Sequence, residues 1–152
     1  MIKKAETEFK DQMERSMMEF LRLNGCKTFL GGSRRFGYGN ERSDIDIMVH
    51  ISGGWKNEMT LGSSLRALGF TPNYSPYENS SSSVWVLGTL FHLSIFMHEG
   101  AFRDLYDEHI KIETALRKAP LLKDFIISLK RNTNMTGATL YRMLRDTVLA
   151  NA

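Results

Sequence analysis

The chain has 152 residues, of which 42% are hydrophobic and 24% charged, a composition that is ordinary for one globular domain. Its longest apolar-rich run, from Val84 to Met97, is interrupted by Gly88 and His92 and is too short for the ~20 residues of a membrane-spanning helix. The net charge of +3 and the pI of about 9.1 suit a partner that carries phosphate, although many proteins without such a partner are equally basic.

The N-terminal segment and the cysteine content bear on the compartment. Residues 1–20 carry acids throughout and have no apolar core followed by a cleavage site, so they are unlike a signal peptide. The single Cys26 has no second cysteine in this chain with which to form a disulfide. We therefore expect a cytoplasmic protein that has no membrane partner.

The first part of the chain predicts a helix and two strands. Apolar residues at helical spacing predict a helix over 3–23, which the turn at 24–25 ends. Residues 26–32 predict a short buried strand that ends in glycines, and 33–42 a compact turn or one short helical turn. Residues 43–51 alternate between polar and aliphatic, which is typical of a strand.

The rest of the chain predicts a helix at about 56–68, a polar loop, a hairpin and three more helices. The loop over 71–83 has two prolines and four consecutive serines, and such a loop is either mobile or a lip over a site. The hairpin strands and final helices are expected at about 84–87, 90–97, 101–118, 121–131 and 136–149. This order predicts one small α+β domain over 1–152, with a mixed sheet, flanking helices and a helical C-terminal tail. Its core would cover about 26–98.

Two aspartates one residue apart begin the strand predicted over 43–51. Asp44 and Asp46 point to one face, and their carboxylates can reach a common point, because such side chains are roughly 7 Å apart at the backbone. The like charges repel unless a cation lies between them, and Mg²⁺ commonly takes one or two carboxylates together with substrate phosphates. The alternative is a pair of solvent-facing acids on an edge strand. Ser43, just before them, is best interpreted as a turn residue or cap.

A small-residue turn precedes the acid pair. Gly31, Gly32 and Ser33 let backbone N–H groups and a hydroxyl approach a phosphate with no Cβ in the way. Arg34 and Arg35 add positive charge beside them. Each part also has a plainer interpretation, with the glycines as a tight strand exit and the arginines as a solvated turn.

The segment FLGGSRRFGYGNERSDIDIMV, residues 29–49, resembles the nucleotidyltransferase superfamily that includes DNA polymerase beta, CCA-adding enzymes, aminoglycoside nucleotidyltransferases and the minimal bacterial nucleotidyltransferases. Gly32 and Ser33 match the family's phosphate-binding signature, and Asp44 and Asp46 match its metal-binding pair. The resemblance is sharp over this segment and loose over the following helix and hairpin, and the C-terminal helices carry no signature of the family. It implies a polymerase-beta-type fold whose sheet carries the acids, with helices packed on the other face.

The resemblance also implies a magnesium-dependent reaction. Two Mg²⁺ ions would bridge Asp44, Asp46 and a nucleoside triphosphate, with ATP as the default donor. One ion would help an acceptor hydroxyl attack the α-phosphorus, and the other would stabilise the departing pyrophosphate. Gly32, Ser33 and Arg34 would hold the β- and γ-phosphates. The acceptor would be a hydroxyl on RNA, on a protein or on a small molecule.

Active members of the family usually present a third carboxylate from a later strand, on the face of the first two. Here that strand is the second of the hairpin, and its polar-face residues, His92, Ser94 and His98, include no acid. His92 is the candidate for this position, as base or ligand, although Mg²⁺ prefers oxygen and the plainer role is a hydrogen-bonded histidine on a half-buried sheet face. Alternatively, Glu99 or Asp104 supplies the acid, although both are expected near the start of the next helix.

The missing acid leaves three functions open. The first is nucleotidyl transfer, with Asp44, Asp46 and His92 as catalytic residues. The second is a catalytically degenerate protein that binds a nucleotide, a tRNA or a partner protein without turnover. The third and weakest is an antitoxin-like pairing with another protein, as in minimal nucleotidyltransferases that modify a cognate partner. The late basic residues, among them Lys130 and Arg131, are expected mostly on solvated helix faces, from which some could guide a triphosphate or a nucleic acid toward the cleft.

Overall fold

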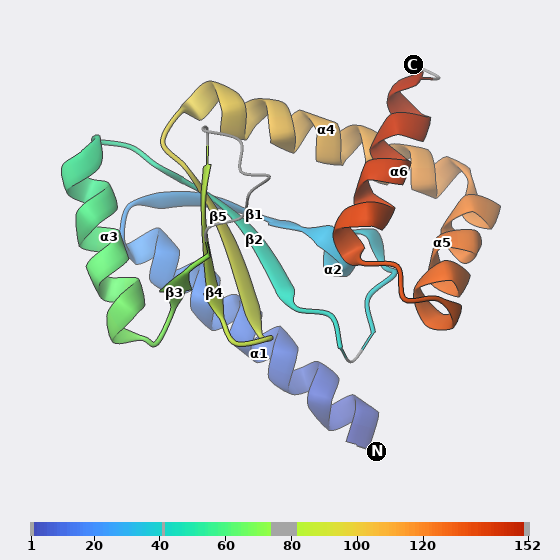
Figure 1. Cartoon of the computed structure of the whole chain (residues 1–152), viewed down its shortest axis with the longest axis horizontal. Helices are drawn as coiled ribbons and strands as arrows, with labels where there is room; N and C mark the ends of the chain where they lie inside the picture. The colour runs from blue at the N-terminus through green and yellow to red at the C-terminus, as the bar shows by residue number, and fades with distance from the viewer. Residues whose placement is uncertain (1, 41, 74–81, 151–152) are drawn as a thin grey trace.

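The computed structural model describes residues 2–40, 42–73 and 82–150 of the chain, and it has a central sheet with helices on both faces (Figure 1). The helices are α1 (Ile2–Leu23), α2 (Gly32–Phe36), α3 (Trp55–Ala67), α4 (Glu99–Lys118), α5 (Pro120–Asn132) and α6 (Gly137–Ala150). The strands are β1 (Cys26–Gly31), β2 (Ile45–Ile51), β3 (Thr71–Pro72), β4 (Ser82–Leu87) and β5 (Phe91–Phe96). Within the described ranges, no helix combines the length and the apolarity that crossing a membrane requires.

The sheet is mixed, and its strand order is β1-β2-β5-β4-β3. β2 lies between β1, with which it is antiparallel, and β5, with which it is parallel. The parallel pair requires a crossover connection, which α3 and the antiparallel strands β3 and β4 provide. The prediction of a small α+β fold with a mixed sheet and flanking helices is therefore confirmed.

The aliphatic face of β2 forms the main hydrophobic core with α1 and α3. Its members include the alternate residues of β2, the facing residues of β5 and one side of each helix, namely Ile45, Ile47, Val49, Ile51, Leu93, Ile95, Leu21, Leu61 and Leu65. Burying a side chain of this size is worth about 1.5–3 kcal/mol, so this layer fixes the register of β2 and hence the face on which Asp46 lies.

The opposite face of β2 is divided between a polar end and an apolar end. Asp46 lies at the polar end and is only partly buried. Farther along, Met48 and His50 are buried, and Met48 packs in a cluster with Phe96 and with Phe102 of α4. We expected the helices to pack on the face opposite the acids, and this is wrong for α4. It packs on the acid face, because the apolar side chains at the far end of that face must also be buried.

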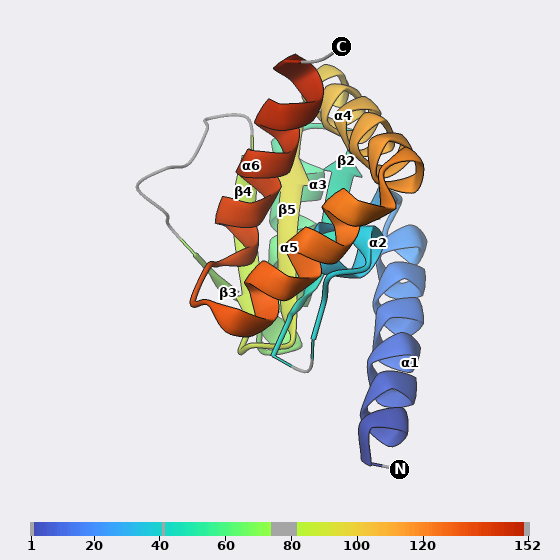
Figure 2. The same ribbon diagram turned by 90° about the vertical axis from the view of Figure 1, so that its right-hand side faces the viewer.

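The last two helices extend this cover toward the acid end of the sheet. α5 and α6 lie on the side of α2, at the opposite end from α3 (Figures 1 and 2). Their apolar sides join α4, the end of α2 and the segment after it in a second large cluster: Phe36, Tyr38, Ile112, Leu116, Ile126, Leu140 and Leu144. This packing places helices from the last third of the chain beside the first residues of β2.

The described elements agree with the predicted ones to within a few residues. β5 ends at Phe96, so His98 is not on the strand but directly precedes α4. Two parts of the predicted polar loop are strands, since Thr71–Pro72 forms β3 and Ser82 and Ser83 begin β4. The remainder of that loop, residues 74–81, lies outside the described residues, and so does the prediction that it is either mobile or a lip over a site.

Candidate functional site

A cavity of about 650 Å³ opens at the end of the sheet where β2 begins. Asp44 and Asp46 line it, and Gly32 and Ser33 line the same cavity from the turn after β1. The other walls come from β5 and the C-terminal helices. The acid pair and the small-residue turn thus line one cavity. We call this space the acid cavity.

Gly32 lies against Asp46 in a way that only glycine allows. Its φ of +62° is in the left-handed region, and a Cβ built on it would be 2.8 Å from Asp46 Oδ2 and 3.0 Å from Asp46 Cβ. The missing side chain therefore lets the backbone of the turn approach the carboxylate.

A hydrogen-bonded loop fixes the residue before the acid pair. Ser43 is buried, and its Oγ accepts a 3.0 Å hydrogen bond from the backbone N–H of Asn40. The Ser43 carbonyl accepts a 2.7 Å hydrogen bond from Lys10 Nζ of α1. The interpretation of Ser43 as a turn residue is confirmed, and its contacts hold Asp44 directly before β2.

The charged forms of Asp44 and Asp46 are electrostatically unfavourable beside one another. Burial and the neighbouring charge of Asp46 raise the pKa of Asp44, and the positive charges of His92 and Lys130 only partly oppose them. A cation between the two carboxylates would relieve this repulsion. Among the described residues, no cluster of three or more His, Cys, Asp or Glu side chains could hold a metal ion. A metal here would therefore need oxygen ligands from water or a bound phosphate, which is the set that Mg²⁺ commonly takes.

His92 is the direct partner of Asp46 across the parallel strands. The two residues are paired in register, and His92 Nδ1 lies 3.1 Å from Asp46 Oδ1. This hydrogen bond, with the charges of both aspartates, raises the pKa of His92 above its ordinary value despite partial burial. His92 thus lies where the resemblance expects a third carboxylate, and it also meets the plainer interpretation of a hydrogen-bonded histidine on the sheet.

The alternative sources of a third acid lie elsewhere. Glu99 begins α4 and forms ion pairs with Lys27, at 3.3 Å, and with Arg103, at 2.8 Å. Asp104 is exposed on α4. Neither acid lines the acid cavity.

The two arginines of the turn are held in ion pairs with helices. Arg34 contacts Asp11 at 2.5 Å and Glu14 at 2.9 Å, both on α1. Arg35 contacts Glu113 of α4 at 2.8 Å. Arg34 does not line the acid cavity. The side chains of both arginines are largely buried, so the alternative interpretation of a solvated turn is wrong.

No protein-family model and no curated protein matches the chain, whereas solved structures do. The protein GrpB from Enterococcus faecalis matches 97% of this chain and 94% of its own, with a TM-score of 0.64 and 16% identity. Terminal uridylyl transferase 4 from Trypanosoma brucei, with bound UTP and UpU, matches 93% of this chain with a TM-score of 0.59 and 13% identity. Cid1 in complex with the UTP analogue UMPNPP matches 84%, with a TM-score of 0.51 and 16% identity. This chain has the nucleotidyltransferase fold.

The matches differ in how much of the other protein they cover. The chain corresponds to 54% of the uridylyl transferase and to 44% of Cid1, but to nearly all of GrpB. At these low sequence identities, the structural similarity shows a shared nucleotidyltransferase fold but does not show a shared activity.

Within the nucleotidyltransferase fold, the acid cavity has walls that sequence reasoning did not identify. His109 of α4 and Tyr141 of α6 both line it. His109 is 1% exposed, its Nδ1–H donates to the Leu105 carbonyl at 2.8 Å, and its Nε2 has no hydrogen-bond partner among the described residues. Burial lowers the pKa of His109, which favours an uncharged imidazole in the wall of the acid cavity. The Tyr141 hydroxyl donates to Glu108. These residues come from helices that carry no local signature, so only the tertiary packing identifies them.

Proposed function

We propose that this chain is a cytoplasmic, Mg²⁺-dependent nucleotidyltransferase that moves a nucleoside monophosphate from a nucleoside triphosphate, ATP by default, to a hydroxyl of RNA, a protein or a small molecule. One observation carries the proposal: the two aspartates share a cavity with the glycine-serine turn, and Gly32 leaves room for the close approach of that turn to Asp46. The nucleotidyltransferase fold of the chain supports the proposal.

The carboxylates of Asp44 and Asp46 suit Mg²⁺, because they are hard oxygen donors. Burial and the charge of Asp46 together raise the pKa of Asp44, and a bound cation would favour its charged form. When bound, Mg²⁺ would neutralise phosphate charge and polarise the α-phosphate toward attack. His92 Nδ1 holds Oδ1 of Asp46 and thereby orients this carboxylate. The backbone and hydroxyl of Gly32 and Ser33 are proposed to contact the β- and γ-phosphates.

Arg34 is the weakest part of the proposed phosphate site. Its guanidinium already contacts Asp11 and Glu14, so a phosphate would compete with two carboxylates for it. Lys130 of α5 lines the acid cavity, and none of the described carboxylates lies within ion-pair distance of it. We therefore propose that Lys130 supplies the phosphate-facing charge and that Arg34 mainly joins α2 to α1.

His92 is proposed to take up the proton of the acceptor hydroxyl. The Nδ1–H donates to Asp46, which leaves Nε2 as the nitrogen that accepts the proton. This base works only when it is neutral, and its pKa is raised above the ordinary value of about 6.5. The proposal therefore predicts a rate that increases with pH as His92 loses its proton.

A second candidate function is nucleotide or RNA binding without turnover. It is favoured by the wall of the acid cavity, where no described residue supplies a third carboxylate. The two functions differ in one measurable product, because both bind a nucleoside triphosphate but only the enzyme releases pyrophosphate.

The experiment incubates the full chain with Mg²⁺, each radiolabelled nucleoside triphosphate and total cell extract, and then measures pyrophosphate and identifies what is labelled. Turnover that Asp44→Asn abolishes supports the enzyme. The matched control is Asp107→Asn, an exposed aspartate of α4 that lines neither the acid cavity nor the neighbouring one. Metal-dependent binding with no pyrophosphate from any of the four nucleotides would instead support the binding protein.

A further inference from the structure

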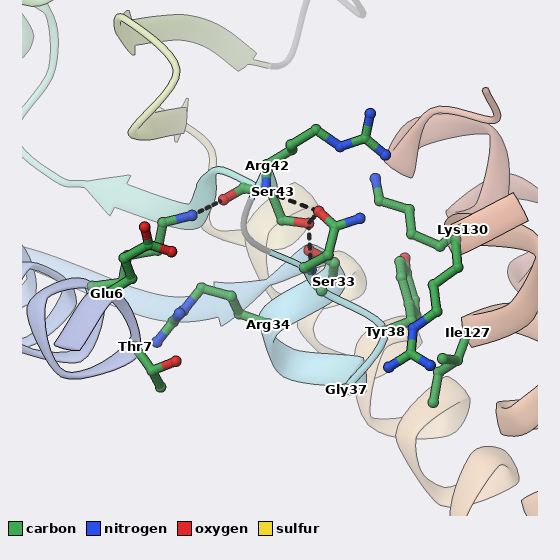
Figure 3. Close-up of a pocket in the computed structure, with 14 residues that line it drawn as sticks. Glu6, Thr7, Ser33, Arg34, Gly37, Tyr38, Arg42, Ser43, Ile127 and Lys130 are labelled. Carbon is green, nitrogen blue, oxygen red and sulfur yellow. Dashed lines mark hydrogen bonds between the residues drawn. The ribbon is translucent and has the colours of Figure 1, made fainter. Parts of the chain in front are cut away.

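A second cavity, of about 790 Å³, lies between α1, the loop from α2 to β2, and α5 (Figure 3). It does not contain the acid pair. Four residues, Ser33, Arg42, Ser43 and Lys130, line both spaces and so form a shared wall with the acid cavity. We call this second space the basic cavity.

The lining of the basic cavity is strongly positive. Five cationic side chains from four segments line it, and Glu6 is the single carboxylate among the described lining residues. The cations are Lys10, Arg34, Arg42, Lys130 and Arg131. Such an excess of one sign in a concave site concentrates ions of the opposite sign.

Three of these cations have no carboxylate partner among the described residues. Arg34 is paired with Asp11 and Glu14, whereas no described acid lies within ion-pair distance of Arg42, Lys130 or Arg131. Figure 3 shows the side chains of Arg42 and Lys130 extending toward one another from the loop and from α5. Like charges that converge in this way are unfavourable unless an anion lies between them.

A buried hydroxyl provides an independent sign of a ligand. Tyr38 lines the basic cavity and is 2% exposed, and its hydroxyl has no hydrogen-bond partner among the described residues. A buried hydroxyl without a partner costs about 1–3 kcal/mol. Burial and the charge of Asp46 raise the pKa of Tyr38, so the hydroxyl keeps its proton and can donate it in a hydrogen bond. Acceptor-rich anions are the natural partners for such a donor beside cations.

We propose that the basic cavity binds the phosphate groups of a polyphosphate, as a second anion site that continues the phosphate track out of the acid cavity. The connection between the two cavities rests on the proposed function, because a triphosphate bound in the acid cavity would end at the shared wall, beside Ser33 and Lys130. Three cations that have no carboxylate partner among the described residues line one concave volume, which matches a compact, multiply charged ligand better than an extended strand. The terminal phosphates of a bound triphosphate and the released pyrophosphate share this chemistry.

The test measures binding of inorganic pyrophosphate and tripolyphosphate to the full chain by titration calorimetry, in chelator and at fixed ionic strength. Without metal the acid pair repels these anions, so binding reports the basic cavity. We expect Arg131→Ala to weaken binding at least about tenfold, a change of about 1.4 kcal/mol. Arg142→Ala removes the same charge from an exposed position of α6 that lines neither cavity, and it should change binding less than about twofold.

Two further arms identify the source of the phosphate. Weaker binding of Mg²⁺–ATP in Arg131→Ala supports terminal phosphates of the donor, and weaker binding of pyrophosphate with unchanged binding of Mg²⁺–ATP supports the released product. Absence of polyphosphate binding in chelator, or equal losses in Arg131→Ala and Arg142→Ala, would overturn the proposal. So would an RNA oligonucleotide without a 5′ triphosphate that binds more tightly than tripolyphosphate and depends on Arg131. Because these measurements need no turnover, they stand if Asp44→Asn shows that the proposed function is wrong.

Discussion

Asp46 faces His92 across the parallel pair of β2 and β5, and Asp46 Oδ1 lies 3.1 Å from His92 Nδ1. This single contact joins a proposed metal ligand to the residue that we propose takes the place of the third carboxylate. It makes the role of His92 testable by substitution at one position.

His92→Ala should lower the rate of pyrophosphate release about 10²–10⁴-fold, the usual contribution of a general base. His92→Asp restores a carboxylate at the same register position and should retain more activity than His92→Ala. The assay is pyrophosphate release at saturating Mg²⁺ and nucleoside triphosphate. Full activity in His92→Ala would show that the histidine is structural.

The Asp46–His92 contact should make stability depend on pH in a defined direction. The folded-state pKa of His92 is raised, so its stabilisation is complete below the unfolded value of about 6.5 and is lost as pH rises through the folded value. In urea unfolding, His92→Gln should therefore cost more stability at about pH 5 than at about pH 9. His98→Gln, at an exposed position, should show no such difference. An equal cost at both pH values would contradict a charged pair.

Asp44→Asn should stabilise the protein at neutral pH in chelator. The folded-state pKa of Asp44 is raised, so ionisation opposes folding as pH rises above the unfolded value of about 3.9. The advantage of the variant should therefore disappear at about pH 3. Addition of Mg²⁺ should raise the thermal midpoint of the native chain more than that of the variant, because a ligand that binds only the folded state stabilises it. Equal midpoint shifts would place the metal elsewhere.

Gly32→Ala should impair both stability and activity. The new Cβ would lie 2.8 Å from Asp46 Oδ2 in a left-handed backbone conformation, and we expect a loss of about 1–3 kcal/mol in unfolding free energy. Gly25→Ala is the matched control, since Gly25 also has a positive φ but a Cβ there meets nothing within 4 Å. Urea unfolding and pyrophosphate release together separate the backbone cost, which both variants share, from the contact with Asp46. Equal losses of activity in the two variants would show that the close approach is unimportant.

Arg34→Ala should act mainly on stability. It removes ion pairs with Asp11 and Glu14 and leaves Glu14, which is 20% exposed, without its partner. We expect a loss of about 1–3 kcal/mol in urea unfolding, with less than about a threefold change in KM for the triphosphate. A large rise in KM at unchanged stability would instead show that Arg34 binds phosphate.

The sequence alone predicted the order of elements and the acid end of the sheet. Alternation over β2 places Asp44 and Asp46 on one face, because Ile45, Ile47 and Val49 must be buried together on the other. The small-residue turn was predictable for a similar reason, since the short path from Gly32 to Asp46 joins neighbouring antiparallel strands. Features of this kind can be predicted from sequence because the residues that define them are close along the chain.

The tertiary structure alone decided what surrounds that acid pair. Helical periodicity reports that one side of α4, α5 and α6 is buried, but it does not say against which surface. His109, Lys130 and Tyr141 reach the acid cavity only because those helices pack on α2 and on the acid face of the sheet. The pairing of Arg34 with α1 was equally invisible in sequence, since its partners Asp11 and Glu14 lie on a separate helix. Contacts between distant segments depend on how whole faces are buried, and short-range spacing carries no information about that.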